Sequence, residues 1–411
     1  MGDAPVNSQS NTTLTFCTTH EIENLIKKIL GNRRYRFGTV IREHIPKGYL
    51  SQVEALPSEN AYYIPHHAVR REDKMTSKLG VVLDASAKTK NDLSLNDILH
   101  TGPSLQNDLF GILLNLRLFP IAVSADVRQI YLCIKVRKED CRYQRILYRF
   151  DPQRPLQAYQ YNCVAFGLKG SPFSALRAIK QLTDIINRDV YVDDIASSAL
   201  NEQEAIRAAG ELIELFQSGG FQLAKWASNS SKVLENIPFE LRLSQSVTFD
   251  SDASLKILGQ RWHPLDDIFA FEVTPDNRTC TKRNILSSVA RLFDVMGLVA
   301  PIIIQAKLLI KELWILKIDW DEIPPTSISR QWQQFNAELP SISLIRIPRH
   351  VGVAEGCTLK LVGFADAREK AYGAVIYAQV TTPDNRIEVQ LVWAKSRVAP
   401  LKVASLARLE L

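Results

Sequence analysis

Two adjacent carboxylates, Asp193 and Asp194, lie in an otherwise apolar segment of the chain. Because successive side chains of a strand point to opposite faces, two neighbouring aspartates cannot both be buried in a core. A tight hairpin turn suits them better, since aspartate tolerates the turn backbone and both carboxylates can face one solvated cleft. Like charges this close repel each other unless a cation lies between them, so the pair indicates a divalent metal site. The alternative interpretation is an ordinary turn that contains aspartate.

A third carboxylate precedes this pair. Residues 120–126 show the pattern of a buried strand that ends in Asp126, and a further apolar run follows. Two strands that deliver carboxylates to one end of a sheet make the oxygen-rich site preferred by Mg²⁺, and Mn²⁺ is the second candidate. Two such ions about 4 Å apart activate an attacking hydroxyl and stabilise a leaving pyrophosphate. Positioning and charge neutralisation do most of the catalysis in such a reaction, so few other groups are needed.

The composition limits what can position these groups. A chain of 411 residues with 46% hydrophobic and 23% charged residues has room for two or three globular domains. The net charge of +6 is a mild bias towards a polyanionic partner. The six cysteines are scattered and predict reduced thiols of an intracellular protein rather than a zinc site. No apolar run reaches a membrane-spanning length and the polar start is not a signal peptide, so we expect no membrane partner.

Several phrases now resemble one known family. The Asp126 strand, then Phe166-Gly-Leu-Lys-Gly-Ser-Pro172, then Tyr191-Val-Asp-Asp194 is similar to the palm of reverse transcriptases. Further phrases resemble the Pol polyprotein of BEL/Pao-type LTR retrotransposons, from about residue 55 to the last residue: Tyr62 to Ala68, Val82 to Ser86, Leu93 to Asp97, Thr101 to Pro103 and Lys225 to Asn229. Independent phrases in the family's order make the resemblance specific.

The resemblance implies an α+β fold, with the palm and fingers of a right-hand polymerase, a helical thumb and connection, and a partial ribonuclease H-like α/β domain. Residues 1–55 are expected to form an N-terminal segment, residues 56–125 the fingers with palm entry, and residues 126–262 the palm. Residues 263–350 would form the thumb with connection, and residues 351–411 the truncated ribonuclease H-like domain. The N-terminal segment is expected to be partly disordered.

The local patterns agree with this division. Residues 201–217 predict an amphipathic helix that Gly219 and Gly220 stop, with one apolar face made by Ala205, Ala208, Leu212 and Leu215. Residues 358–365, 373–378 and 389–393 predict three strands. Without covering helices, these strands are expected to leave an apolar sheet face exposed, and the segment should be poorly ordered or lean on the connection.

The resemblance also assigns roles to the carboxylates and to the nucleotide-binding residues. Asp126 and Asp193 become the principal metal ligands and Asp194 a supporting one. Tyr131 would lie beneath the nucleotide sugar, where its ring clashes with a 2′-hydroxyl and selects dNTPs; the alternative is an aromatic residue of the core. Lys225 would approach the nucleotide's phosphates; the alternative is a stem packed beside Trp226.

Other residues carry weaker assignments. The segment that begins at Phe166 and Gly167 would line the template base and the incoming nucleotide. Lys78 belongs to a basic segment that closes over the triphosphate in the family, or else to a solvated loop. The adjacent histidines His66 and His67 point to opposite sides of an extended segment, so they cannot chelate one ion and are expected to be structural.

The implied function is RNA-directed DNA polymerisation, in which a primer 3′-hydroxyl attacks a dNTP on an RNA or DNA template-primer. The resemblance implies a cytoplasmic location, within virus-like particles, and leaves the oligomeric state open. The rival hypothesis is a catalytically inactive remnant that at most binds nucleic acid. A nuclease is a third and weaker reading.

Three departures from the family favour the rival. Gly80 stands where relatives carry a basic residue that clamps the triphosphate. The link from Pro172 to Tyr191 is short. The ribonuclease H-like part contributes only Asp366 and Glu410 before the sequence stops, which predicts a fragment or a decaying copy.

Overall fold

The computed structural model describes residues 37–54, 61–70, 79–89, 91–151, 153–182, 188–243 and 254–401. The chain divides into two compact units. The first unit contains residues 1–105 and 129–182, and the second contains residues 106–128 and 183–411. The chain therefore leaves the first unit, builds one helix and one strand of the second, and returns before it completes the second. No helix in the described ranges is long and apolar enough to cross a membrane.

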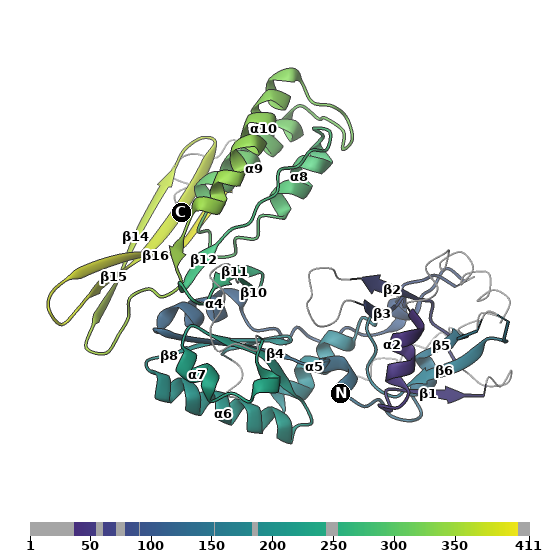
Figure 1. Ribbon diagram of the computed structural model, residues 1–411. Coiled ribbons are helices and arrows are strands. Elements are labelled where there is room, and N and C mark those ends of the chain that lie inside the picture. Colours follow the sequence, from purple (N-terminus) through teal and green to yellow (C-terminus); the bar gives the residue numbers. More distant parts are fainter. Residues whose placement is uncertain are drawn as a thin grey trace, which may run out of the picture. The chain divides into compact units, whose positions relative to one another are not determined.

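The first unit is a small α+β assembly, drawn in purple and blue in Figure 1. Its three-stranded sheet has the order β1-β6-β5, and β2 and β3 form a separate antiparallel hairpin. The core between these elements includes Ile41, Leu50, Leu83, Ile146 and Tyr159. The elements are α2 (Phe37–His44), β1 (Leu50–Val53), β2 (His66–Arg70), β3 (Leu79–Leu83), α3 (Leu95–Ile98), η2 (Ile130–Cys133), η3 (Cys141–Tyr143), β5 (Arg145–Tyr148), β6 (Gln157–Tyr161) and α5 (Ser171–Lys180).

The second unit begins with a four-stranded antiparallel sheet of order β7-β8-β4-β9. Its strands and helices are α4 (Leu109–Leu118), β4 (Ile121–Val127), β7 (Val190–Tyr191), β8 (Asp194–Ala199), α6 (Glu202–Ser218), β9 (Leu223–Ser228) and α7 (Ser231–Glu235). Figure 1 shows α4 on one side of this sheet and α6 on the other. Helices therefore cover both faces of this sheet. This burial explains why the side chains of β4 are apolar almost throughout.

Helix α6 begins and ends where the sequence indicates. The Asn201 side chain caps the first turn by accepting from the Glu204 amide, and Gly219 follows the last residue. The buried face, however, consists of Ala205, Ala209 and Phe216, whereas Ala208 is exposed. The predicted apolar face was therefore wrong at Ala208.

A second sheet and three helices follow. The sheet has the order β10-β11-β12-β13, made by β10 (Leu255–Ile257), β11 (Gln260–His263), β12 (Ile268–Ala270) and β13 (Ile347–Pro348). The helices are α8 (Lys282–Ala290), α9 (Ala300–Ile315) and α10 (Thr326–Glu338), and η6 (Leu339–Leu344) ends the group. Trp262, Phe269 and Trp332 are almost fully buried in the core that these elements share with α4.

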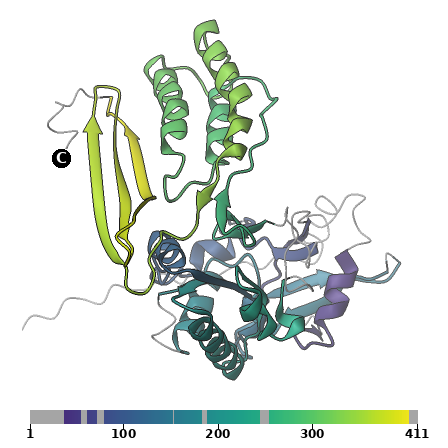
Figure 2. The same ribbon diagram turned by 60° about the vertical axis from the view of Figure 1, so that its left-hand side comes forward.

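The last described part is an antiparallel meander, the yellow-green sheet of Figure 2, made by β14 (Thr358–Ala367), β15 (Ala371–Thr381) and β16 (Ile387–Val398). Strand β16 packs against α9, and the Ala394 amide donates to the Met296 carbonyl at 2.9 Å. At Gly297 a Cβ would lie 1.7 Å from the Ala394 carbonyl oxygen, so only glycine permits this approach. Leu359 and Leu361 lie on one face of β14 and are exposed, which confirms the expected apolar sheet face.

Two buried arginines join these parts of the second unit. Arg117 of α4 donates to the backbone carbonyls of Arg349, Pro348 and Val392, at 2.9, 3.1 and 2.8 Å. Arg349 forms an ion pair with Asp267 at 2.6 Å and also donates to the Pro120 carbonyl at 2.7 Å. Both guanidinium groups are fully buried. Burial, with a smaller contribution from the Arg349 charge, lowers the pKa of Arg117 to about 10, so it remains protonated at neutral pH.

Candidate active site

The hairpin of β7 and β8 presents the paired aspartates. Tyr191 and Asp194 are register partners, so Val192 and Asp193 form the two-residue turn. Val192 has a φ of 56°, which is the left-handed region that two-residue hairpin turns require and that a β-branched residue seldom adopts. The turn is therefore tight, as the sequence predicts, and its strained residue is the valine rather than an aspartate.

Strand β4 brings the third carboxylate to this hairpin. Asp126 is the register partner of Asp194 in the antiparallel β4–β8 pair. Directly opposed residues of such a pair lie on one face, with Cβ atoms about 4.5–5.5 Å apart. The Val127 amide donates to the Asp193 carbonyl at 2.7 Å, which fixes the turn at the end of the ladder. The structure thus sets Asp194 directly across from Asp126 and Asp193 in the adjoining turn.

Two of the three carboxylates are arranged as a hard divalent cation requires. Carboxylate oxygens are the ligands that Mg²⁺ prefers, and Mg²⁺ is often held by one or two carboxylates together with waters and substrate phosphates. The cross-strand pair of Asp126 and Asp194 meets that requirement. Within the residues that the structure describes, no group of three or more His, Cys, Asp or Glu side chains could hold one ion. The joint three-carboxylate cluster is therefore a prediction that the described geometry does not display.

Lys225 of β9 contacts the same carboxylate. Its Nζ lies 2.6 Å from Oδ2 of Asp126, and the two side chains are 31% and 21% exposed. The next residue, Trp226, is 1% exposed and lies in the core. The ammonium of Lys225 is thus directed to the aspartate, while the neighbouring ring is directed into the protein.

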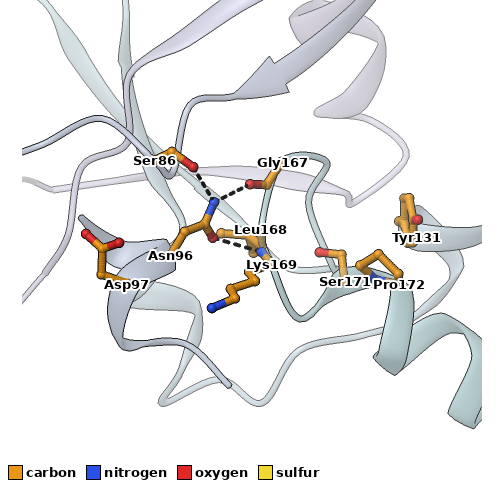
Figure 3. A pocket seen from close by; sticks show the side chains of 9 residues that line it. All are labelled: Ser86, Asn96, Asp97, Tyr131, Gly167, Leu168, Lys169, Ser171 and Pro172. Atoms are coloured by element: carbon orange, nitrogen blue, oxygen red, sulfur yellow. Dashed lines mark hydrogen bonds between the residues drawn. The ribbon is translucent and has the colours of Figure 1, made fainter. Parts of the chain in front are cut away.

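A separate cavity of about 510 Å³ lies within the first unit (Figure 3). Its lining includes Tyr131 and the segment 167–172. The ring of Tyr131 meets that of Phe166 edge-on, with 4.8 Å between centroids, and both residues are half-buried. Tyr131 is therefore at the edge of a cavity rather than inside the core.

Asn96 fastens the loop that forms one wall of this cavity. Its side-chain amide donates to Ser86 Oγ at 2.9 Å and to the Gly167 carbonyl at 3.0 Å. Its carbonyl oxygen accepts from the Lys169 amide at 2.8 Å, so three hydrogen bonds converge on one side chain (Figure 3). Sequence reasoning assigned no role to Asn96, although this residue of α3 belongs to the phrase from Leu93 to Asp97 that carries the family resemblance.

Gly167 has a backbone role in this loop. Its φ is 103°, and a Cβ would lie 1.9 Å from the Leu83 carbonyl oxygen. The Leu83 amide also donates to the Phe166 carbonyl at 2.9 Å. Glycine is required here because the loop lies directly on β3.

Asp97 lines the cavity and forms an ion pair with Lys88. Hydrogen bonds from Lys88, at 2.6 Å, and from Ser94 lower the pKa of Asp97 well below its usual range. The carboxylate is therefore ionised at neutral pH. The Lys88 ammonium neutralises this charge, and Lys169 adds a positive charge to the lining of the cavity.

The remaining predicted residues do not join either group. Lys78 and Glu410 lie outside the described residues. Asp366 is on β14, with its carboxylate 3.6 Å from Arg368, and both side chains are largely exposed. His66 is buried and His67 exposed on β2, which confirms that they cannot chelate together; burial lowers the pKa of His66 to about 4. At Gly80 a Cβ would meet nothing within 4 Å, so the backbone does not require glycine there.

The comparisons identify the C-terminal part first. Residues 281–411 match the family model of the Pao retrotransposon-like RNaseH-like domain. This part of the chain is Pao retrotransposon-like. The Pao-type resemblance inferred from sequence is thereby confirmed over these residues. The matched range starts at residue 281 and so takes in α8, α9 and α10, which were assigned from the sequence to the thumb and connection. The boundary at residue 351 stays a prediction.

Solved structures extend the likeness over most of the chain. A foamy viral protease-reverse transcriptase dRH in complex with ds DNA is 15% identical, with a TM-score of 0.57 over 89% of this chain and 55% of that one. A foamy viral protease-reverse transcriptase in complex with RNA/DNA hybrid is 14% identical, with a TM-score of 0.59 over 91% of this chain and 44% of that one. This chain spans about half the length of those proteins. No curated protein matches its sequence.

These comparisons bear on the fold. The mixed α+β fold of this chain is similar to that of the two foamy viral protease-reverse transcriptases, as predicted. Identities this low show shared architecture, so the chemistry has to be argued from the site itself.

Proposed function

We propose that this chain is an RNA-directed DNA polymerase, the reverse transcriptase region of a Pao-type retrotransposon. The observation that carries the proposal is the register pairing of Asp126 with Asp194 beside the turn residue Asp193, in a reverse transcriptase-like fold. A core sheet that aligns carboxylates at one strand end needs a reason, because opposed like charges destabilise a strand pair. Lys225 offsets the charge of Asp126, and a divalent cation between the two carboxylates would offset both charges.

Asp126, Asp193 and Asp194 would hold Mg²⁺ or Mn²⁺. When bound, the ions would activate the primer 3′-hydroxyl and neutralise the leaving pyrophosphate. The protein's own contribution is to hold the carboxylates and the substrates in place. Antiparallel pairing fixes the positions of Asp126 and Asp194, and the buried Arg349 anchors the start of β4 through the Pro120 carbonyl.

Residues of the first unit would bind the incoming nucleotide. Tyr131, Phe166 and Gly167 form or adjoin the cavity that Asn96 braces, and Lys78 and Lys225 would neutralise phosphate charge. In domain terms, residues 56–125 would be fingers with palm entry and residues 126–262 the palm. The partners would be a template-primer and dNTPs, and the proposed site of action is the cytoplasm, within virus-like particles.

Primer extension tests the proposal. The purified full chain is incubated with an RNA template, a DNA primer, dNTPs and Mg²⁺ or Mn²⁺, and extension is followed on a sequencing gel. Fluorescence anisotropy with the same labelled template-primer measures binding separately. We expect extension that requires the divalent ion. Binding without extension in either metal would contradict the proposal and would favour an inactive remnant, to which glycine in place of a basic residue at position 80 also points.

Replacing Tyr131 with valine should weaken the choice between dNTPs and rNTPs. The ring stands at the edge of the cavity, where it would meet a 2′-hydroxyl, and valine removes that contact. We expect the ratio of kcat/KM for dNTP over rNTP to fall at least about tenfold. Tyr143→Val is the matched control, since this half-buried tyrosine of the same unit does not line the cavity. Equal ratios in both variants would show that Tyr131 only packs against Phe166.

The ribonuclease H-like part is expected to be inactive on RNA–DNA hybrids. Two-metal hydrolysis needs a carboxylate cluster, whereas Asp366 is exposed and lies beside Arg368. Incubation of the full chain with a 5′-labelled RNA strand in a hybrid should therefore leave that strand intact. RNA cleavage that disappears in Asp366→Asn would refute this expectation.

A further inference from the structure

The side chain of Lys225 reaches Asp126 because the strand pairing is irregular at this position. Along the β4–β9 pair, Ser124 faces Ala227 but Asp126 faces Ala224. Two residues of β9, Lys225 and Trp226, therefore stand opposite the single Ala125. This is a β-bulge, which inserts one extra residue into one strand and redirects its side chains.

The bulge decides which way Lys225 points. In a regular strand, the residue after Ala224 would project to the face opposite Asp126, since side chains alternate. Lys225 instead has a φ of 56° and places its ammonium 2.6 Å from the carboxylate. A left-handed backbone at a residue other than glycine is costly and persists where the surrounding structure imposes it. Trp226, 1% exposed, then continues into the core and fixes the strand on the other side.

The ion pair of Lys225 involves Asp126, and the proposed function makes this carboxylate a ligand of a divalent cation. An ammonium and a divalent ion that share one partly exposed carboxylate compete for its charge and for its lone pairs. Among the described residues of the second unit, a further lysine ion pair joins Lys232 and Glu202 at 2.9 Å. It lies on an exposed surface and involves none of the three aspartates.

We propose that Lys225 is a built-in counterion of the metal site. Its ammonium occupies Asp126 while no divalent ion is bound, and an arriving ion displaces it. This inference rests on the proposed function, since it assigns Asp126 to the cation. The displaced ammonium stays on its bulge beside the site, where it can meet an anion such as a phosphate group. Metal binding and the position of Lys225 are then coupled, and each state of the site keeps Asp126 neutralised.

Metal affinity tests this coupling without any catalytic readout. Binding of Mn²⁺ to the full chain is measured by electron paramagnetic resonance of the free ion, at constant ionic strength. Removing a positive charge from a carboxylate raises its affinity for cations by about tenfold or more. Lys225→Met, which keeps the apolar stem, should thus bind Mn²⁺ about tenfold more tightly than the wild type. Lys232→Met is the matched control and should bind as the wild type does.

A second measurement uses the unaltered protein, so it does not depend on how the variants fold. Brief acetylation followed by mass spectrometry reports how accessible each lysine is. Saturating Mg²⁺ should increase the acetylation of Lys225 severalfold and leave that of Lys232 unchanged. Equal Mn²⁺ affinity of wild type and Lys225→Met, or Lys225 acetylation that Mg²⁺ does not change, would overturn the inference.

The two proposals fail in distinguishable ways. If Asp126→Asn weakens Mn²⁺ binding but Lys225→Met leaves it unchanged, the metal site stands and only the counterion role is refuted. If Asp126→Asn has no effect on Mn²⁺ binding and the wild type does not extend primers, the proposed function falls and the counterion role falls with it.

Discussion

Replacing Arg349 with methionine is expected to lower the free energy of unfolding of the second unit by about 3–5 kcal/mol. The guanidinium is fully buried and donates to both carboxylate oxygens of Asp267, at 2.6 and 2.7 Å. It also donates to the backbone carbonyls of Leu116, Phe119 and Pro120. Methionine offers no donor, so the partly buried Asp267 carboxylate would lose its ion pair and the Leu116 and Phe119 carbonyls would lose this donor. Asp267 would keep the Trp262 Nε1–H and the Pro120 carbonyl would keep the Asn229 amide. Urea unfolding followed by tryptophan fluorescence measures the change.

Arg346→Met is the control for this experiment. Arg346 lies on the same segment but is exposed, and exposed substitutions of this kind change stability by about 0.5 kcal/mol or less. The midpoint should therefore shift strongly for Arg349→Met and little for Arg346→Met. Similar midpoints for the two variants would mean that the buried ion pair does not hold the second unit together.

Replacing Asp126 with asparagine is expected to reduce primer extension by about a thousandfold, because an amide cannot supply the negative charge that holds a divalent cation. Folding should be nearly unaffected. The side chain is 21% exposed and its ion pair with Lys225 is exposed to solvent in part, so its loss costs about 1 kcal/mol or less. Single-turnover extension with saturating dNTP gives the rate, and a thermal melt checks the fold.

Asp266→Asn separates the effect of the site from a general effect of charge. Asp266 belongs to the same unit and is exposed, so its variant should extend primers at the wild-type rate. Wild-type extension by Asp126→Asn would remove this aspartate from the proposed mechanism. Loss of activity together with a large drop in melting temperature would point to misfolding and not to chemistry.

The sequence predicted the elements of the candidate site better than their details. The apolar run before Asp126 and the phrase around Asp193 contain strong local signals, and both form the strands and the turn that those signals indicate. The register that sets Asp194 across from Asp126 could not be predicted, since it depends on pairing between segments far apart in the sequence. The same is true of the bulge at Lys225, where no glycine announces the left-handed backbone.

The ends of strands and the buried faces of helices were also predicted less well than the elements themselves. The three predicted strands of the meander form, but each is longer than its apolar pattern, and β16 extends from Ile387 to Val398. Backbone pairing with β15 continues beyond the apolar residues, so hydropathy alone ends the strand too early. In α6 the buried face depends on where the helix lies on the sheet, which explains why Ala209 rather than Ala208 is buried.

The buried arginines also constrain the order in which the molecule can be made. Arg117 finds its acceptors at Arg349 and Val392, which are 232 and 275 residues further along the chain. At a translation rate of about 5–20 residues per second, these acceptors follow Arg117 out of the ribosome only after roughly 10–50 s. Until these acceptors have emerged, the guanidinium of Arg117 on α4 remains unburied. Strand β4, which follows α4 and bears Asp126, therefore lacks the packing that it has in the complete fold. The proposed metal site of the nascent chain should therefore form last, when the C-terminal sheet has emerged.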